Sequence, residues 1–136
     1  MATKISWSAT PLKKTKPTVP SSRQSMLKEK ADKLIDDIIK PTHVKPAPTD
    51  NDYNYIADIQ SKWYRNYFYF CATYNCPSPN AISPSFETKF ARMEYVADNK
   101  FNLAYMRHTE QWFEVFKAIS MDDCLKSIEE DPIFMP

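Results

Sequence analysis

The chain contains no glycine among its 136 residues. Average usage is about 7%, or roughly nine glycines in a chain of this length. Glycine adopts left-handed backbone conformations most readily, so turns that need a positive φ must use Asn or Asp here, or be avoided. P-loops, dinucleotide-binding turns and nucleophile elbows also place glycine where the backbone approaches a ligand. The sequence therefore argues against ordinary nucleotide-binding loops and against the α/β-hydrolase site.

Residues 87–116 contain three short runs rich in aromatic and branched side chains, separated by polar turns. They predict strands at 88–96, 101–108 and 111–116, the first two joined by a turn in which Asp98 or Asn99 is left-handed. Because the second turn lacks Asn-Gly, we expect a looser loop of four residues there. The run YFYFCATY predicts a fourth strand, with Phe68, Phe70 and Ala72 facing the core and Tyr67, Tyr69 and Cys71 on the other face.

Residues 22–40 predict an amphipathic helix that covers the sheet, with Ser22 or Ser25 as its N-cap. Pro41 is expected to end this helix, because proline lacks the amide donor that a helix needs. The apolar stripe of the helix recurs at 3.6-residue spacing: Leu27, Ala31, Leu34, Ile35 and Ile38.

Two further helices are predicted. Helical spacing, with Asp50 or Asp52 as the cap, relates Tyr55, Ile56, Ile59 and Trp63. A last helix is expected after Ser120, which stands three residues before Asp123 in the manner of a capping box. The apolar tail at 133–136 is expected to dock on the core.

These elements predict a single α+β domain at 26–136: a four-stranded antiparallel meander packed with two or three helices, with a proline-rich linker at 41–50. Residues 1–25 contain prolines, Ser/Thr and bases but no acid, and predict a disordered basic arm. Residues 1–49 carry ten Lys/Arg and four Asp/Glu, whereas 50–136 carry eight and thirteen. This asymmetry indicates a basic tail on an acidic domain.

From Tyr69 to Pro136 the chain contains the segments FCATYNCPSPNAISPSF, FARMEYV, FNLAYMRHT, QWFEVF and the closing EEDPIF. In these segments the C-terminal half resembles a group of small uncharacterised cyanobacterial proteins. The resemblance implies a lineage and no activity.

We weigh two chemical sites against simple structural roles. His108 with Glu110 or Glu114 offers an acid–base pair, but no nucleophile or second histidine accompanies it, so a solvated face is preferred. Zinc could be bound by Cys71 and Cys76 together with Cys124, His108 or His43, but the spacing lacks the paired ligands of structural zinc sites. We therefore predict free thiols, no catalytic residue, no metal and no cofactor.

The odd number of cysteines, and the absence of an apolar run of membrane-spanning length, predict a soluble cytoplasmic protein, with an organelle stroma as the alternative. We predict a non-enzymatic accessory or adaptor protein that binds another protein, because Trp, Tyr and Arg dominate interface energetics. Its candidate surface is Arg92, Arg107, Trp112, Tyr67 and Tyr69. The alternative is single-stranded RNA binding by the aromatic sheet and the basic arm, through Lys13, Lys14, Lys16 and Arg23. The oligomeric state stays open.

Overall fold

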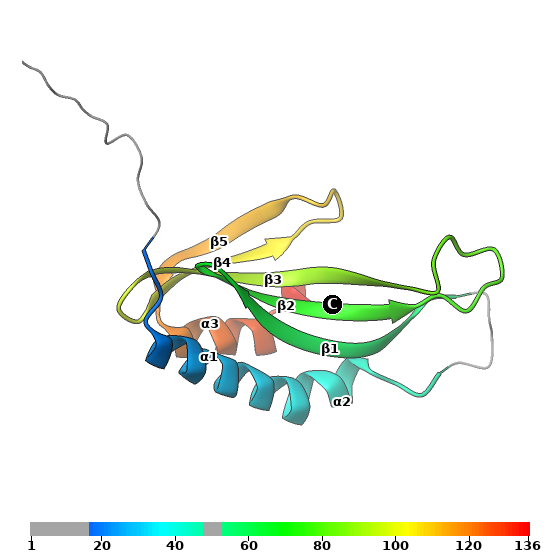
Figure 1. The fold of residues 1–136 in the computed structure, drawn as a ribbon, viewed down its shortest axis with the longest axis horizontal. Coiled ribbons are helices and arrows are strands. Elements are labelled where there is room, and N and C mark those ends of the chain that lie inside the picture. Colours follow the sequence, from blue (N-terminus) through cyan, green and yellow to red (C-terminus); the bar gives the residue numbers. More distant parts are fainter. Residues whose placement is uncertain (1–16, 48–52) are drawn as a thin grey trace, which may run out of the picture.

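The computed structural model describes residues 17–47 and 53–136. Its centre is one antiparallel sheet with strand order β1-β2-β3-β4-β5: β1 (Tyr55–Tyr64), β2 (Tyr67–Asn75), β3 (Ser85–Ala97), β4 (Lys100–Met106) and β5 (Trp112–Ile119). The helices α1 (Ser21–Leu34), α2 (Lys40–His43) and α3 (Met121–Glu130) lie along one face of this sheet (Figure 1). The predicted α+β class and antiparallel meander are confirmed, but the sheet has five strands, not four. The predicted arm up to residue 16 and the linker at 48–50 lie outside the described residues.

The extra strand is β1, which was predicted to be a helix, so that prediction is wrong. The strand pairs with β2 along its whole length, from Tyr55 opposite Asn75 to Tyr64 opposite Tyr67. A register shift near Asp58 breaks the two-residue alternation of a strand. This irregularity leaves the apolar residues of β1 at spacings that resemble those of a helix.

Bulges also decide which side chains of β3 reach the core. Ala91, Met93 and Tyr95 are buried on the helix-covered face, opposite residues of β2 and β4. Phe90 would point away from the core by simple alternation, yet it is 5% exposed and packs within the core. The register shift between Phe70 and Cys71 of β2 explains this, because it leaves Phe90 as an extra residue on β3.

Left-handed residues occur at four described positions, and the prediction that they would be Asn or Asp is right only for Asp98. The other three are Arg65, Glu110 and Ala118, with φ of 56°, 63° and 52°. Arg65 lies in the short turn between β1 and β2, and Glu110 lies in the loop before β5. Each non-glycine residue in this region costs roughly 1–2 kcal/mol of backbone strain, which the sheet must offset.

The first helix is longer than predicted and changes its winding. Its start, at Ser21 with Pro20 as N-cap, excludes Ser22 and Ser25 as caps and places residues 21–25 outside any disordered arm. The helix also continues through Pro41 to His43. A π-helical turn, η2 (Ile35–Ile39), directly precedes that proline. Such a wider turn relieves the crowding between a proline ring and the preceding helical carbonyl.

The π turn also shifts the helix face that meets the core. Leu27, Ala31 and Ile35 are buried as predicted, but Ile38 is 39% exposed and Ile39 is 5% exposed in its place. A π turn contains about one residue more than an α-helical turn, so the apolar stripe shifts by one position. Ile39 therefore packs in the core at the place predicted for Ile38.

Polar contacts fix α1 against the new strand β1. The hydroxyl of Ser61 is buried and donates to Asp32 at 2.7 Å, while Lys28 donates to the Ser61 carbonyl at 2.8 Å. The indole of Trp63 donates to the carbonyl of Gln24 at 3.1 Å. These bonds satisfy polar groups that would otherwise destabilise a buried interface.

The predicted helix after Ser120 is confirmed as α3. The hydroxyl of Ser120 accepts from the amide of Asp123 at 3.1 Å, as an N-cap does. Met121, Cys124 and Ile128 are buried on the core. A 3-10 turn, η3 (Pro132–Phe134), then places Phe134 in the core at 2% exposure. The expected docking of the apolar tail therefore holds for Phe134, whereas Ile133 and Met135 are exposed.

Candidate functional site

We call the sheet face opposite the helices the open face, because the described helices all pack on the other side (Figure 1). Strand register places Tyr67 and Tyr69 of β2 on this face, since their neighbours Phe68 and Phe70 are buried on the other. The same register places on it Gln60, Lys62, Tyr64, Glu87, Lys89, Arg92, Glu94, Asn102, Ala104, Met106, Trp112 and Glu114.

Four of the five predicted partner-binding residues meet on this face: Tyr67, Tyr69, Arg92 and Trp112, which we call the aromatic cluster. The guanidinium carbon of Arg92 lies 4.9 Å from the ring centroid of Tyr67 and 4.8 Å from that of Trp112. The rings of Tyr69 and Trp112 are 5.8 Å apart, and those of Tyr67 and Tyr69 are 6.0 Å apart. Each member is partly exposed, so the cluster is both ordered and accessible.

The aromatic cluster reaches from β2 to β5 for two reasons: the sheet curls, and the strand β4 between Arg92 and Trp112 carries a small residue, Ala104. Tyr69 lies on β2 and Trp112 on β5, and three strand intervals amount to about 14 Å in a flat sheet. Their ring contact therefore requires the sheet to curl toward the open face. Between them, Ala104 of β4 stands opposite Arg92 and is only 1% exposed. A larger side chain at this position would occupy the space through which Arg92 reaches Trp112.

The guanidinium of Arg92 is held mainly by ring stacking. Its Nε is buried and has no hydrogen-bond partner in the described part of the chain. A planar guanidinium is well suited to lie between aromatic faces, where an ammonium group makes a less extensive contact. The side chain is therefore fixed in orientation before any partner arrives.

Charged residues of both signs flank the cluster. Lys89 lies 5.5 Å from the ring centroid of Tyr69, and Lys62 pairs with Glu87 at 2.8 Å. This pairing, aided by a hydrogen bond from Gln60, lowers the pKa of Glu87, and it raises the pKa of Lys62. A hollow of about 380 Å³ lies beside them, lined by Lys62, Trp63, Tyr64, Tyr69 and Lys89. These flanking residues are not predicted from the sequence, because the bulge at Phe90 must be known before Lys89 can be placed beside Tyr69.

The fifth predicted residue, Arg107, is not part of the cluster. It lies in the β4–β5 loop with its guanidinium carbon 5.5 Å from the ring centroid of Phe113. For the nucleic-acid alternative, Arg23 lies in α1, on the other side of the sheet. The remaining candidates of that alternative, Lys13, Lys14 and Lys16, lie outside the described residues.

The acid–base pair considered from the sequence, His108 with Glu110 or Glu114, does not form. His108 is exposed in the β4–β5 loop, and no hydrogen bond or ion pair joins it to Glu110 or Glu114 within the described ranges. Glu114 lies instead 3.7 Å from Lys117.

The three cysteines are free thiols, as predicted, and two of them are buried. Burial raises the pKa of Cys71, and it raises the pKa of Cys124 to about 12. Across residues 17–47 and 53–136, no three His, Cys, Asp or Glu side chains gather where they could hold a metal ion.

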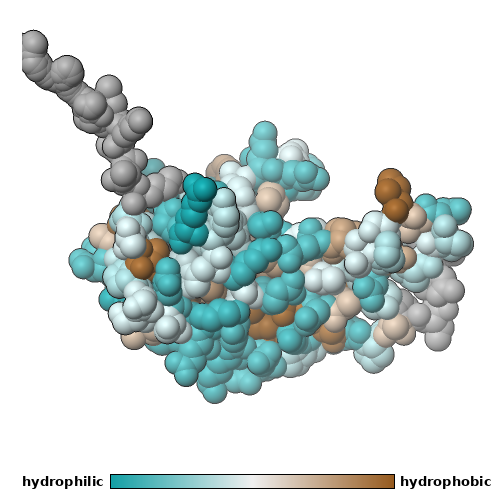
Figure 2. Space-filling model, in the orientation of Figure 1, coloured by the Kyte–Doolittle hydropathy of each residue, from teal (hydrophilic) through white to brown (hydrophobic). Residues whose placement is uncertain are grey.

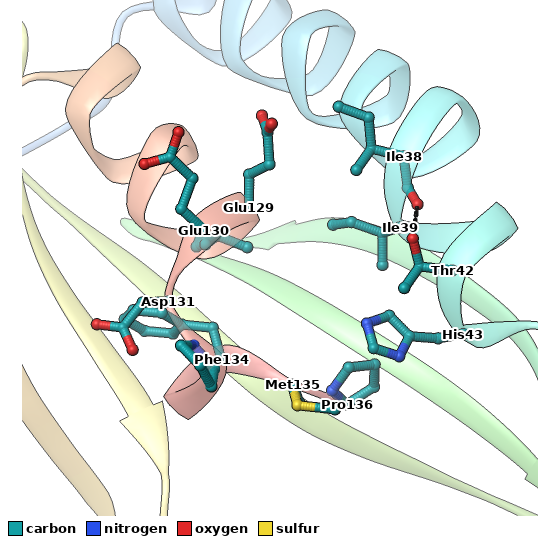
Figure 3. Close-up of a pocket in the computed structure, with 12 residues that line it drawn as sticks. Ile38, Ile39, Thr42, His43, Glu129, Glu130, Asp131, Phe134, Met135 and Pro136 are labelled. Atoms are coloured by element: carbon teal, nitrogen blue, oxygen red, sulfur yellow. Dashed lines mark hydrogen bonds between the residues drawn. The ribbon is translucent and has the colours of Figure 1, made fainter.

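A cavity of about 260 Å³ lies between α2 and the C-terminal segment (Figure 3). Thr42 donates its hydroxyl to the carbonyl of Ile38, and the carboxylates of Glu129 and Glu130 point away from the cavity. The ring of His43 faces Pro136, and burial lowers its pKa. With few polar groups directed inward, this cavity offers less recognition chemistry than the open face.

The face of the molecule seen in Figure 2 is mainly hydrophilic, with hydrophobic side chains in small separate patches. No helix within the described ranges is long and apolar enough to cross a membrane.

Comparison with known proteins supplies a family without an activity. The family described as "Domain of unknown function (DUF3024)" matches residues 19–136, which extends well beyond the half of the chain that carried the resemblance. This match supports an uncharacterised conserved domain and does not bear on a cyanobacterial origin. No curated protein and no solved structure matches the chain. Because the match covers almost all of the chain, the protein belongs to the DUF3024 family.

Proposed function

We propose that this protein is a non-enzymatic adaptor that binds another protein through the open face of its sheet. The observation that carries the proposal is the position of Arg92 between Tyr67 and Trp112 on a partly exposed surface. Arg, Tyr and Trp supply most of the binding energy at protein interfaces. Side chains that are already ordered lose less entropy on binding, so the cluster is suited to act as an anchor.

Binding of single-stranded nucleic acid is the second candidate, and one observation favours it: Lys89 lies over the ring of Tyr69, beside Lys62. Two features favour a protein partner instead. The rings of the aromatic cluster face each other and Arg92, whereas base stacking needs a free ring face. Glu87, Glu94 and Glu114 also lie on the open face, where they would repel phosphates.

Affinity capture from the native cell, with the full chain as bait, tests the adaptor proposal. We expect a partner that the unaltered chain recovers and that both Arg92→Ala and Trp112→Ala lose. The matched control is Lys126→Ala, an exposed residue of α3 on the opposite face. Equal recovery of every protein by all four baits would contradict the proposal.

Fluorescence anisotropy with single-stranded RNA at low and high salt separates the two candidates. Phosphate contacts make binding weaken steeply as salt rises. We expect no salt-dependent binding by the full chain. A clear salt slope that is reduced in Lys89→Ala would favour nucleic acid instead.

The proposal assigns the protein to the cytoplasm, with an organelle stroma as the alternative. The cyanobacterial origin implied by the resemblance stays a prediction.

A further inference from the structure

The described chain begins at the end of the sheet that holds the β1–β2 turn. Pro17 and Val19 line the same hollow as Arg65 in the β1–β2 turn, and Val19 is anchored in the core at 6% exposure. The residues on either side of that turn, Tyr64 and Tyr67, both belong to the open face. Residues 1–16 are therefore tethered at one end of this surface.

The charge of residues 1–16 is opposite to that of the remaining chain. The segment has four lysines and no acid, whereas residues 17–136 have 14 basic and 17 acidic residues. Lys13, Lys14 and Lys16 directly precede Pro17. Near this end of the open face, Glu94 stands opposite Tyr67 on the neighbouring strand.

The segment is also long enough to reach the aromatic cluster. Its apolar side chains include Ile5, Trp7 and Leu12. Pro17 lies ten positions after Trp7, and an extended chain spans about 3.3 Å per residue, or about 33 Å in all. Trp112 lies three strand intervals across the sheet from Tyr67, about 14 Å, and about four residues along the strands, about 13 Å. Together these amount to about 20 Å, so Trp7 can reach Trp112 on β5.

We propose that residues 1–16 dock on the open face of their own chain, with the lysines toward Glu94 and Trp7 at the aromatic cluster. The segment lies outside the family match, which begins at residue 19. A protein partner must then displace it, a consequence that rests on the proposed adaptor function. Docking itself does not depend on that function.

Tethering makes weak docking sufficient. A short linker holds a segment at an effective concentration in the millimolar range, so a contact of about millimolar affinity is occupied in roughly half of the molecules. The same tether lets a partner of higher affinity replace the segment.

Paramagnetic relaxation enhancement in the full chain tests the docking. A spin label is attached to Ser8→Cys, next to Trp7, in a Cys76→Ser background. Cys71 and Cys124 are 0% exposed, so the new thiol is the reactive one. We expect the Trp112 indole signal to fall by roughly half or more relative to the reduced label, in line with the expected occupancy. The amide of Glu129, on α3 at the opposite face, should keep its intensity.

A matched variant replaces Lys13, Lys14 and Lys16 with serine in the labelled chain. It should restore the Trp112 signal, because these lysines supply the charge attraction. An unchanged Trp112 signal in the parent chain, or equal losses at Trp112 and Glu129, would overturn the docking. A loss that disappears when labelled chain is diluted with unlabelled chain would assign the contact to a second copy, and would overturn it too.

The experiment contains no partner, so failure of the adaptor proposal leaves its result unchanged. Displacement is tested separately, with the recovered partner. The lysine-to-serine variant should bind that partner about twofold more tightly, because half of the molecules no longer need to release the segment. Equal affinity would overturn the displacement.

Discussion

The guanidinium of Arg92 lies 4.8 Å from the ring centroid of Trp112, although the two residues belong to strands that do not pair with each other. The contact passes over Ala104 of the intervening strand, whose small side chain leaves the space free. It joins β3 to β5 on the open face and so stabilises the curl of the sheet. The residues that we propose for recognition therefore also contribute to the fold.

This dual role predicts a measurable loss of stability when the stack is removed. Arg92→Ala deletes contacts to two rings, and a partly desolvated cation–π contact contributes about 0.5–2 kcal/mol. We expect the free energy of unfolding, measured by urea denaturation, to fall by about 1–2 kcal/mol. Arg92→Lys should recover only part of the loss, because an ammonium group is not planar. Arg107→Ala, which removes one contact in an exposed loop, is the control and should change stability by less than about 0.5 kcal/mol. Equal effects of Arg92→Ala and Arg107→Ala would contradict the stacked arrangement.

The π turn before Pro41 makes a second prediction, from two adjacent isoleucines. Ile39 is 5% exposed and Ile38 is 39% exposed. Ile39→Ala should lower the free energy of unfolding by about 2–4 kcal/mol, the usual cost of emptying a buried aliphatic site. Ile38→Ala should cost about 1 kcal/mol or less, because its side chain is partly in water already. Thermal or urea denaturation measures both losses. A larger loss for Ile38→Ala than for Ile39→Ala would mean that the helix continues as a regular α-helix through these residues, without the π turn.

The same π turn shows where sequence reasoning stops. Periodicity correctly placed Leu27, Ala31 and Ile35 on the core, because an α-helix repeats every 3.6 residues. It failed at Ile38, since nothing in local spacing signals one extra residue per turn. It failed again at β1, where the irregular register near Asp58 imitates helical spacing. Tertiary pairing with β2, which the sequence does not display, decides that segment.

The candidate site was also only partly predictable from the sequence. Residue type alone selected Tyr67, Tyr69, Arg92 and Trp112, since these are the side chains that interfaces favour. Their meeting depends on the curl of the sheet and on Ala104, which are long-range properties of the fold. Arg107 has the same chemistry but lies in a loop outside the cluster.

The absence of glycine leads to a third prediction, at Ala118. This residue has φ of 52°, and its amide donates to Asn102 at 2.9 Å. Ala118→Gly should raise the free energy of unfolding by roughly 0.5–1 kcal/mol, because relief of left-handed strain exceeds the entropy that glycine adds to the unfolded chain. The control is Ala97→Gly, an exposed strand end that is not left-handed, where a small loss is expected. Destabilisation by both substitutions would argue against strain at Ala118.

The ion pair between Glu87 and Lys62 makes the stability of the open face depend on pH. Lys62 lowers the pKa of Glu87 below its ordinary value of 4.5. The ion pair therefore contributes fully to the free energy of unfolding above pH 4.5. This contribution is lost as the pH falls through the lowered pKa of Glu87 in the folded state. The pair is partly exposed, so this contribution is a few tenths to about 1 kcal/mol.

We expect Glu87→Gln to be less stable than the unaltered chain at neutral pH, and the difference to shrink as the pH falls below 4.5. Urea denaturation across this range measures the difference at each pH. A difference that stays constant, or grows toward acid, would contradict a lowered pKa for Glu87.

The most direct test of the adaptor account is calorimetric titration of the full chain and its Arg92→Ala variant with the partner recovered by affinity capture. An anchor residue contributes about 2 kcal/mol or more, so we predict that Arg92→Ala raises Kd by at least about tenfold. Lys126→Ala should bind as the unaltered chain does. Equal dissociation constants for the three chains would contradict a binding role for the open face.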